Sequence, residues 1–183
     1  DIYDKHMLVP FGEFMPFGDT FPKLYQMFPQ AGDFTAGSEV KVFEHLGHKI
    51  GIMICYEDIM AEFTGKLAEL EPNVIINVTN DAWFGRTAEP WLHLALSVFR
   101  AVENRLALVR STNTGISTFI DATGRLESTT RIDDAEVLIG DVALLPGGTL
   151  YAAIGNLFVW LLLAGLVAEW FVFRRRQRQG RRP

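Results

Sequence analysis

The sequence contains one cysteine, Cys55, and four histidines among its 183 residues. A single cysteine cannot form a disulfide within the chain, and the four scattered histidines lack the spacing of metal ligands. We therefore expect no internal disulfide, no metal site and no cofactor. In an oxidising compartment the lone cysteine would persist as a free thiol, which marks it as a candidate reactive group.

Positive charge is scarce outside the last ten residues. The chain has 17 lysines and arginines against 22 aspartates and glutamates, and six of the arginines follow residue 173. The part before them therefore holds eleven basic residues against all 22 acidic ones. Because this part is distinctly acidic, we expect no nucleic-acid partner. Repeats and low-complexity linkers are also absent from the sequence.

Charged residues are nearly absent from residues 150–173, where Glu169 is the single ionisable side chain. An apolar run of about 24 residues is long enough to cross a hydrocarbon layer as a helix; the alternative is a buried soluble helix. We predict one transmembrane helix over residues 148–173 and a basic tail over residues 174–183. Since positive charge beside a spanning helix tends to stay in the cytoplasm, residues 1–147 are expected outside it.

The cysteine follows a segment with the composition of a buried strand. Residues 49–54 contain three alternating isoleucines and a glycine, and the polar Tyr56, Glu57 and Asp58 come directly after Cys55. Folds of the α/β class place their chemistry at the carboxyl ends of strands. Cys55 is therefore a candidate nucleophile. The alternative is that a lone cysteine is a small side chain of the core.

Strand and helix patterns alternate through the middle of the chain, and hairpins follow. This order predicts an α/β class with a mixed sheet. The predicted elements are a hairpin over 40–44 and 49–55, helices over 59–71 and 88–105, and strands over 74–79, 106–110, 116–120, 125 onward and 137–142.

The second predicted helix, residues 88–105, is amphipathic. Leu92, Leu96 and Phe99, with Val102 or Ala101, are expected to face the core. A histidine at position 93 of such a helix is more often structural than catalytic, and we interpret it as structural.

The first forty residues are rich in aromatic residues and turns. Residues 2–9 are compatible with a strand that ends at Pro10, and Gly12 would let the backbone bend so that Glu13 turns toward a site. Taken alone, Lys5 and Glu13 would be surface charges. Residues 14–38 are predicted to form a long apolar loop, which either contacts lipid or an acyl chain or simply packs against the domain.

Four short motifs occur in a fixed order, namely KHMLVPFGE at 5–13, ICYED at 54–58, NVTNDAWFG at 77–85 and RSTNTG at 110–115. Together with the C-terminal apolar segment, they resemble the apolipoprotein N-acyltransferases of bacterial inner membranes, which belong to the nitrilase superfamily. The resemblance covers essentially the whole chain. It implies a carbon-nitrogen hydrolase domain, the C-terminal part of an αββα sandwich, facing the periplasm.

The resemblance also implies a Glu-Lys-Cys catalytic set. Cys55 falls on the family nucleophile and Lys5 on the family lysine. The general-base glutamate lies upstream of that lysine, so we expect this chain to be a C-terminal piece that does not turn over by itself. Further site positions implied by the resemblance are Glu13, Tyr56 and Glu57 in support of catalysis, and Trp83 and Asn80 in substrate binding.

The residue types suit acyl transfer. A thiolate attacks an ester carbonyl, and a nearby ammonium group, that of Lys5, both favours the thiolate and helps to hold the oxyanion. The backbone N–H of Tyr56 would be a second oxyanion donor, and Glu13 or Glu57 would orient Lys5.

By resemblance, the acyl donor is a phospholipid, the intermediate is a thioester on Cys55, and the acceptor is the N-terminal amine of a diacylglyceryl-cysteine apolipoprotein, at the final step of lipoprotein maturation. Two alternatives stay open. A membrane-anchored amidase would use the same residues in a closed polar pocket, and an inert fragment would have an ordinary thiol.

Overall fold

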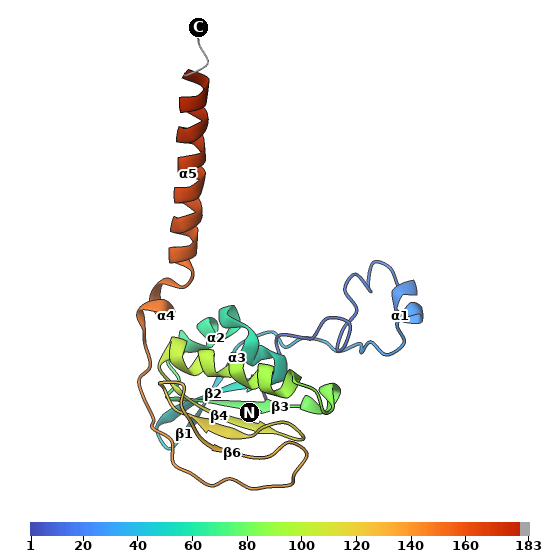
Figure 1. Cartoon of the computed structure of the whole chain (residues 1–183). Coiled ribbons are helices and arrows are strands. Elements are labelled where there is room, and N and C mark those ends of the chain that lie inside the picture. Colours follow the sequence, from blue (N-terminus) through green and yellow to red (C-terminus); the bar gives the residue numbers. More distant parts are fainter. Residues whose placement is uncertain (180–183) are drawn as a thin grey trace. The chain divides into compact units, whose positions relative to one another are not determined.

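The computed structural model describes residues 1–179, and for residues 172 and 175–179 it describes the backbone alone. The chain divides into two compact units, Asp1–Thr149 and the residues from Leu150 onward. The first unit is built on one six-stranded sheet in which spatial order follows chain order (Figure 1). Its strands are β1 (Val42–His45), β2 (His48–Ile54), β3 (Val74–Thr79), β4 (Ala107–Thr112), β5 (Thr118–Ile120) and β6 (Leu126–Thr129).

The sheet is mixed, as the sequence predicts. β2, β3 and β4 are parallel neighbours, whereas β1, β5 and β6 are added antiparallel at the two sides. Ile54 pairs with Val78, and Thr79 pairs with Thr112, so the three parallel strands end at one edge. The segments that follow these strands therefore meet there.

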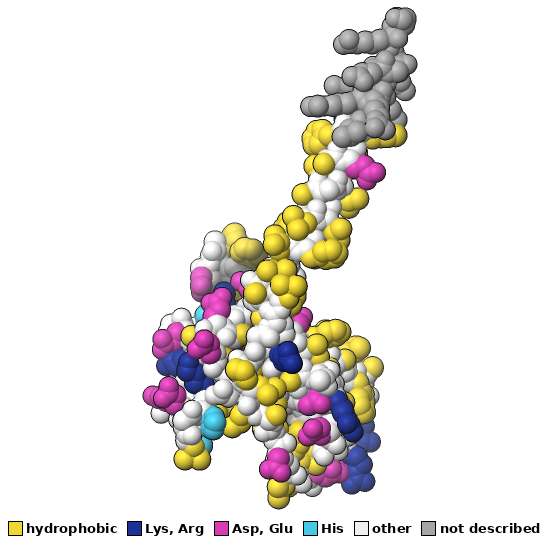
Figure 2. All heavy atoms as spheres, turned by 90° about the vertical axis from the view of Figure 1, so that its left-hand side faces the viewer, with side chains coloured by type: hydrophobic (Ala, Val, Ile, Leu, Met, Phe, Trp, Pro, Cys, Tyr) yellow, Lys and Arg dark blue, Asp and Glu magenta, His cyan; other side chains and the backbone are white. Residues whose placement is uncertain are grey.

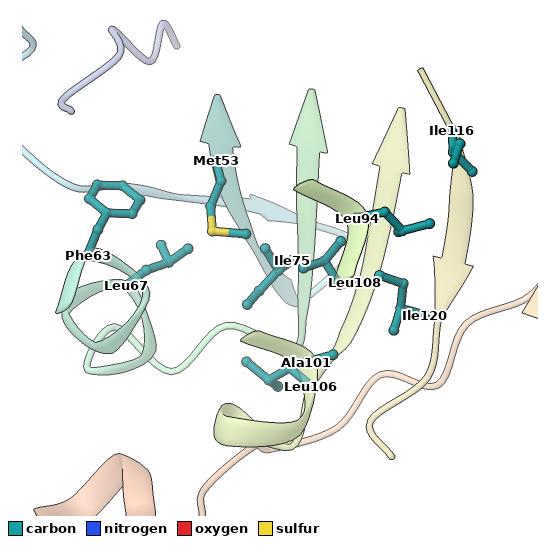
Figure 3. Close-up of a cluster of buried hydrophobic side chains, with 10 residues drawn as sticks. All are labelled: Met53, Phe63, Leu67, Ile75, Leu94, Ala101, Leu106, Leu108, Ile116 and Ile120. Carbon is teal, nitrogen blue, oxygen red and sulfur yellow. The ribbon is translucent and has the colours of Figure 1, made fainter. Parts of the chain in front are cut away.

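Two helices, α2 (Ala61–Ala68) and α3 (Glu89–Asn104), cover one face of the sheet (Figure 3). The hydrophobic core lies between them and the strands, because alternate strand residues point toward the helices. Two 3₁₀ helices, η1 (Cys55–Ile59) and η2 (Asp81–Phe84), follow β2 and β3 directly. The buried core cluster consists of Met53, Phe63, Leu67, Ile75, Leu94, Ala101, Leu106, Leu108, Ile116 and Ile120.

The predicted inward face of α3 is wrong except at Ala101, which is fully buried in the core. Leu92, Leu96 and Phe99 are 61%, 43% and 56% exposed, and Val102 is 43% exposed. The buried side of this helix is instead mostly polar, because buried acidic groups of the neighbouring segments need hydrogen-bond partners there. Its buried residues are Pro90, His93, Leu94, Ser97, Arg100, Ala101 and Asn104.

Two predicted strands are absent from the described residues. Residues 2–9 run as irregular backbone, and residues 137–142 form no strand. Val137 and Ile139 are 86% and 94% exposed, so this segment has the composition of a strand without a partner to pair with. Residues 14–38 form the expected long loop, which contains one short helix, α1 (Lys23–Met27).

The second unit contains two helices where the sequence predicts one. They are α4 (Leu150–Ile154) and α5 (Leu157–Gln179), and Gly155 between them has a φ of +53°. Where its side chains are drawn in colour, the visible side of α5 carries almost only hydrophobic side chains (Figure 2). Within the described residues, no helix has both the length and the apolar character needed to cross a membrane, so the span predicted over 148–173 is not confirmed. Within the predicted basic tail, the backbone of residues 174–179 continues α5, and residues 180–183 lie outside the described residues.

Candidate active site

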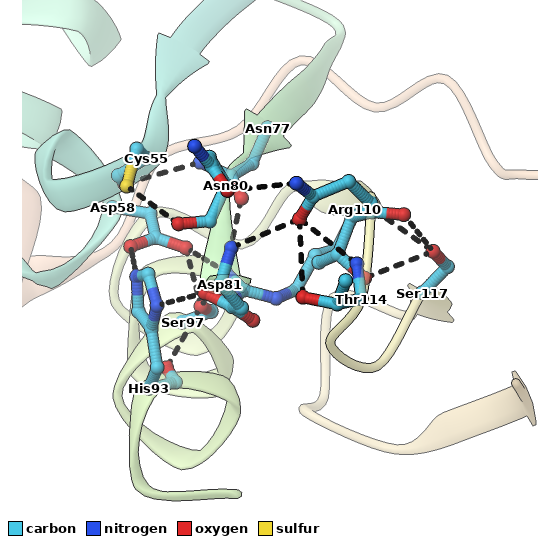
Figure 4. Close-up of polar contacts among 12 residues, drawn as sticks. Cys55, Asp58, Asn77, Asn80, Asp81, His93, Ser97, Arg110, Thr114 and Ser117 are labelled. Atoms are coloured by element: carbon cyan, nitrogen blue, oxygen red, sulfur yellow. Dashed lines mark hydrogen bonds and ion pairs between the residues drawn. The ribbon is translucent and has the colours of Figure 1, made fainter. Parts of the chain in front are cut away.

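Cys55 stands at a sharp turn between β2 and η1. The strand ends at Ile54, and Cys55 has a φ of +52°, in the left-handed region that residues other than glycine rarely adopt. Such strain concentrates at functional sites, where it fixes the direction of a side chain. Here the half-buried thiol faces the segment after β3, with Sγ 4.0 Å from the carbonyl oxygen of Asn80 (Figure 4).

Lys5 and Glu13 form a close ion pair. The Nζ of Lys5 lies 2.6 Å from both carboxylate oxygens of Glu13, and the two side chains are only 11% and 17% exposed. Glu13 also accepts a hydrogen bond of 2.8 Å from the backbone N–H of Val9. The positive φ of this turn falls on Phe11, at 64°, and not on Gly12. Of Glu13 and Glu57, only Glu13 forms an ion pair with Lys5 among the described residues.

Glu57 is fully buried and accepts hydrogen bonds from two segments. The N–H groups of His6 and Met7 donate at 2.6 and 3.0 Å, and the hydroxyl of Tyr3 donates at 2.9 Å. On the other side, the N–H of Ile54 donates at 2.7 Å. Glu57 thus ties the segment that carries Lys5 to the turn that carries Cys55. Burial and the adjacent Glu57 carboxylate raise the pKa of Tyr3 far above its ordinary value.

A cavity of about 240 Å³ opens beside Cys55. Its other lining residues are Val9, Gly12, Glu13, Tyr56, Ile59, Trp83, Phe84, Glu89 and His93.

The cavity brings together four of the predicted site residues, Cys55, Glu13, Tyr56 and the 61% exposed Trp83. Lys5, Glu57 and Asn80 are not part of its wall. Lys5 contacts the wall residue Glu13. The side chain of Asn80 accepts hydrogen bonds from Ala82 N and Asn113 Nδ2. The bond from Ala82 N caps η2. The substrate-binding role of the Asn80 side chain stays a prediction.

Behind the cavity lies a buried cluster of four ionisable residues that no sequence pattern brought together as one group (Figure 4). His93 Nε2 lies 2.7 Å from Asp58 Oδ1, and His93 Nδ1 lies 2.9 Å from Asp81 Oδ1. Arg110 donates to both aspartates. All four residues are at most 4% exposed. Asp58 and Asp81 belong to η1 and η2, so this ionic cluster joins the two segments that carry Cys55 and Trp83.

The carbon-nitrogen hydrolase profile matches residues 1–145. This chain belongs to the carbon-nitrogen hydrolase family. The chain is 38% identical over 174 residues to an apolipoprotein N-acyltransferase of Geobacter metallireducens, covering 94% of this chain and 33% of the relative. With an apolipoprotein N-acyltransferase of Pasteurella multocida it shares 36% identity over 180 residues, covering 95% and 34%. The chain thus spans about a third of the length of these curated relatives.

Solved structures support the fold of this carbon-nitrogen hydrolase chain. A carbon-nitrogen hydrolase from Helicobacter pylori superimposes with a TM-score of 0.55 at 16% identity, over 61% of this chain and 46% of that one. A glutamine-dependent NAD+ synthetase from Acinetobacter baumannii gives a TM-score of 0.57 at 18% identity, over 73% and 24%. At these identities the likeness concerns the fold alone, and it confirms the predicted nitrilase-like α/β class.

In this carbon-nitrogen hydrolase domain the ionic cluster balances its own charge. Burial alone would lower the pKa of His93, but its hydrogen bonds with Asp58 and Asp81 outweigh burial and raise that pKa to about 9. Burial likewise acts to raise the pKa of Asp81, yet hydrogen bonding to His93 and the charge of Arg110 lower it overall. At neutral pH two cations therefore face two carboxylates.

The stability of the domain is expected to fall between pH 6.5 and about 9. His93 has a folded-state pKa of about 9 against an ordinary value of 6.5, so its contribution is complete below pH 6.5 and is lost as the pH rises through 9. The difference corresponds to about 3 kcal/mol of free energy of unfolding. Urea unfolding at a series of pH values measures it.

The control for this pH dependence is His93→Gln, which should be less stable at pH 6.5 and should show a flatter profile up to pH 9. A wild-type free energy of unfolding that stays constant over this window would mean that the buried imidazole is neutral.

Proposed function

We propose that this chain carries the acyl-transfer site of an apolipoprotein N-acyltransferase. Cys55 takes a fatty acyl group from a phospholipid as a thioester and passes it to the N-terminal amine of a diacylglyceryl-cysteine lipoprotein. The observation that carries the proposal is the position of Cys55 in a strained turn beside an apolar cavity. Glu13, which forms the ion pair with Lys5, lines the same cavity. The identity with relatives that carry this name supports it further.

Each residue has a distinct task in the first step. The Cys55 thiolate attacks the ester carbonyl, its sulfur–carbon bond forms, and the carbonyl oxygen becomes an oxyanion. The Lys5 ammonium, held by Glu13, supplies positive charge for the oxyanion. The N–H of Tyr56 is the second donor. The oxyanion then collapses, the ester carbon–oxygen bond breaks, and the expelled lysophospholipid alkoxide takes up a proton from water.

The apolar surroundings favour an acyl chain over a small amide. Ile59, Trp83 and Phe84 line the cavity, and the loop over 14–38 exposes large aromatic side chains. Phe17 and Phe34, for example, are 76% and 63% exposed. Exposed apolar surface of this kind suits contact with lipid. An amidase that acts on a small polar substrate would use a closed polar pocket instead.

Under this proposal the chain works at the bacterial inner membrane, with residues 1–147 on the periplasmic side. The apolar run over 150–173 and the arginines of the tail over 174–183 support attachment there, with the tail in the cytoplasm.

The proposal includes an αββα sandwich. Ile52, Ile76 and Val109 are register neighbours on the face of the sheet opposite α2 and α3, and all three are only half-buried. That apolar face supports the packing of a second sheet against it.

Mass spectrometry of the purified chain after incubation with vesicles of a dipalmitoyl phospholipid tests the function. A single acylation of the thiol is only the first half-reaction and not a full turnover, so it is compatible with a chain that does not turn over by itself. We expect a hydroxylamine-labile adduct with the mass of one palmitoyl group in the wild type, and none in Cys55→Ala. An adduct that survives in Cys55→Ala would contradict the role of this thiol. Ammonia release from short amides without a palmitoyl adduct would favour the amidase.

A further inference from the structure

The cavity wall contains a second carboxylate, Glu89, that the steps above do not use. Glu89 is the first residue of α3 and lines the cavity together with Cys55. Its Oε2 is buried and has no hydrogen-bond partner among the described residues. The other acid of the wall, Glu13, is already engaged by Lys5 and by the Val9 N–H. Of the two carboxylates in this wall, Glu89 is therefore the one with an acceptor oxygen that no described donor occupies.

The place of Glu89 is not explained by helix stability alone. An acid in the first turn of a helix is favourable because of the helix dipole, but a solvent-facing side chain meets that purpose equally well. A buried carboxylate oxygen without a donor is costly, and the cost is recovered when a donor binds. The donor that complements a carboxylate best is a cation that carries N–H groups, such as a primary ammonium.

We propose that Glu89 binds the primary amine of the acyl acceptor and takes up its proton, while the upstream general base implied by the resemblance acts on the Cys55 thiol. This inference rests on the proposed function. The ammonium group pairs with Glu89 and transfers one proton to its carboxylate. The neutral amine then attacks the carbonyl carbon of the Cys55 thioester, a nitrogen–carbon bond forms and the carbon–sulfur bond breaks. The second amine proton passes to the departing thiolate, which leaves an amide and a free Cys55 thiol.

The electrostatic surroundings suit a base. Burial raises the pKa of Glu89 above its ordinary value, the positive charges of His93 and Arg110 oppose this, and the negative charges of Asp81 and Asp58 add to it. A carboxylate with a raised pKa removes a proton more effectively near neutral pH than an ordinary one.

The test separates the second half-reaction from the first. Cys55 is acylated with p-nitrophenyl octanoate, and the decay of the thioester is followed against the concentration of a short peptide with a free N-terminal amine. We expect a saturable transfer in the wild type and a loss of about 100-fold in Glu89→Gln. Glu62 is an exposed carboxylate of α2, so Glu62→Gln serves as the matched control and should behave as the wild type.

Hydroxylamine distinguishes loss of a base from damage to the pocket. It is a neutral nucleophile near neutral pH, so it should clear the thioester at equal rates in the wild type and in Glu89→Gln. The acid limb of the pH profile for peptide transfer should disappear in Glu89→Gln. Equal rates of peptide transfer in the two proteins would overturn the proposal.

The remaining outcomes are also decisive. If the activated ester acylates Cys55 but phospholipid does not, the proposed function fails while the comparison with Glu89→Gln still decides the role of Glu89. If neither acylates Cys55, both are overturned. Should Glu89→Gln fail to fold, the wild-type pH profile decides, because a rate that follows only the protonation of the peptide amine would exclude Glu89 as the base.

Discussion

Arg110→Met is expected to lower the free energy of unfolding by about 3–5 kcal/mol, the range for breaking a buried ion pair by removing one partner. The Arg110 side chain is completely buried and donates hydrogen bonds to both Asp58 and Asp81. It also donates to Asn77 and Ser97 at 2.9 Å. Methionine fills similar space without a charge, so the two carboxylates would keep His93 as their sole cation within the cluster.

Urea unfolding followed by circular dichroism measures this loss. Arg125→Met, at an exposed position near the β5–β6 turn, is the matched control and should change the free energy of unfolding by less than about 0.5 kcal/mol. Adding Asp58→Asn and Asp81→Asn to Arg110→Met should recover part of the loss, because the uncompensated charges are then gone. A loss below about 1 kcal/mol for Arg110→Met would contradict the ionic cluster.

Glu57→Gln is expected to slow the acylation of Cys55 by about 100-fold, the typical cost of misplacing a catalytic group by about 1 Å. Glu57 accepts hydrogen bonds from Tyr3, His6 and Met7 on one side and from Ile54 on the other. A glutamine has one acceptor oxygen and turns an NH₂ group toward donors. The segment around Lys5 would then loosen from the Cys55 turn. The burst of p-nitrophenolate from p-nitrophenyl octanoate measures the rate.

A double-mutant cycle tests whether Glu57 acts through Lys5. If it does, Glu57→Gln should cost little further rate in a Lys5→Met background, since the group that it positions is already gone. Tyr3→Phe removes one of the four donors and should cost only about 1 kcal/mol of stability. Full additivity of Glu57→Gln and Lys5→Met would mean that Glu57 supports the fold independently of Lys5.

The strands around the site were predictable because their signal is local. β3 was predicted with its observed bounds, and the hairpin of β1 and β2 follows from two apolar runs around Leu46 and Gly47. Both turn residues have positive φ, as a two-residue hairpin loop requires. The segment over 137–142 has similar composition, but pairing depends on a neighbour that composition does not reveal.

The orientation of α3 shows where periodicity fails. Leu92, Leu96 and Phe99 form a regular apolar stripe, yet this stripe is exposed. The helix turns His93 and Ser97 inward because Asp58 and Asp81, more than ten residues away in sequence, are buried and need donors. Such a constraint is visible only once β2 and β3 lie side by side.

The candidate site, too, was predictable from the sequence only in part. The position of Cys55 after a strand, and the motifs that contain Lys5 and Glu13, could be found in the sequence. The bonds of Glu57 span about fifty residues and have no local pattern. The acids that directly follow β2 and β3 were a signal for the ionic cluster, since polar residues after parallel strands converge at one edge. Glu89 had no comparable signal.

The rate of alkylation of Cys55 by iodoacetamide near neutral pH tests most directly the central claim that this thiol is an activated nucleophile. The folded chain should react at least about tenfold faster than the same chain unfolded in urea, and Lys5→Met should abolish the difference, because the proposal makes Lys5 the positive charge that serves this thiol. A folded chain that reacts no faster than the unfolded one would identify Cys55 as an ordinary thiol and would contradict the account.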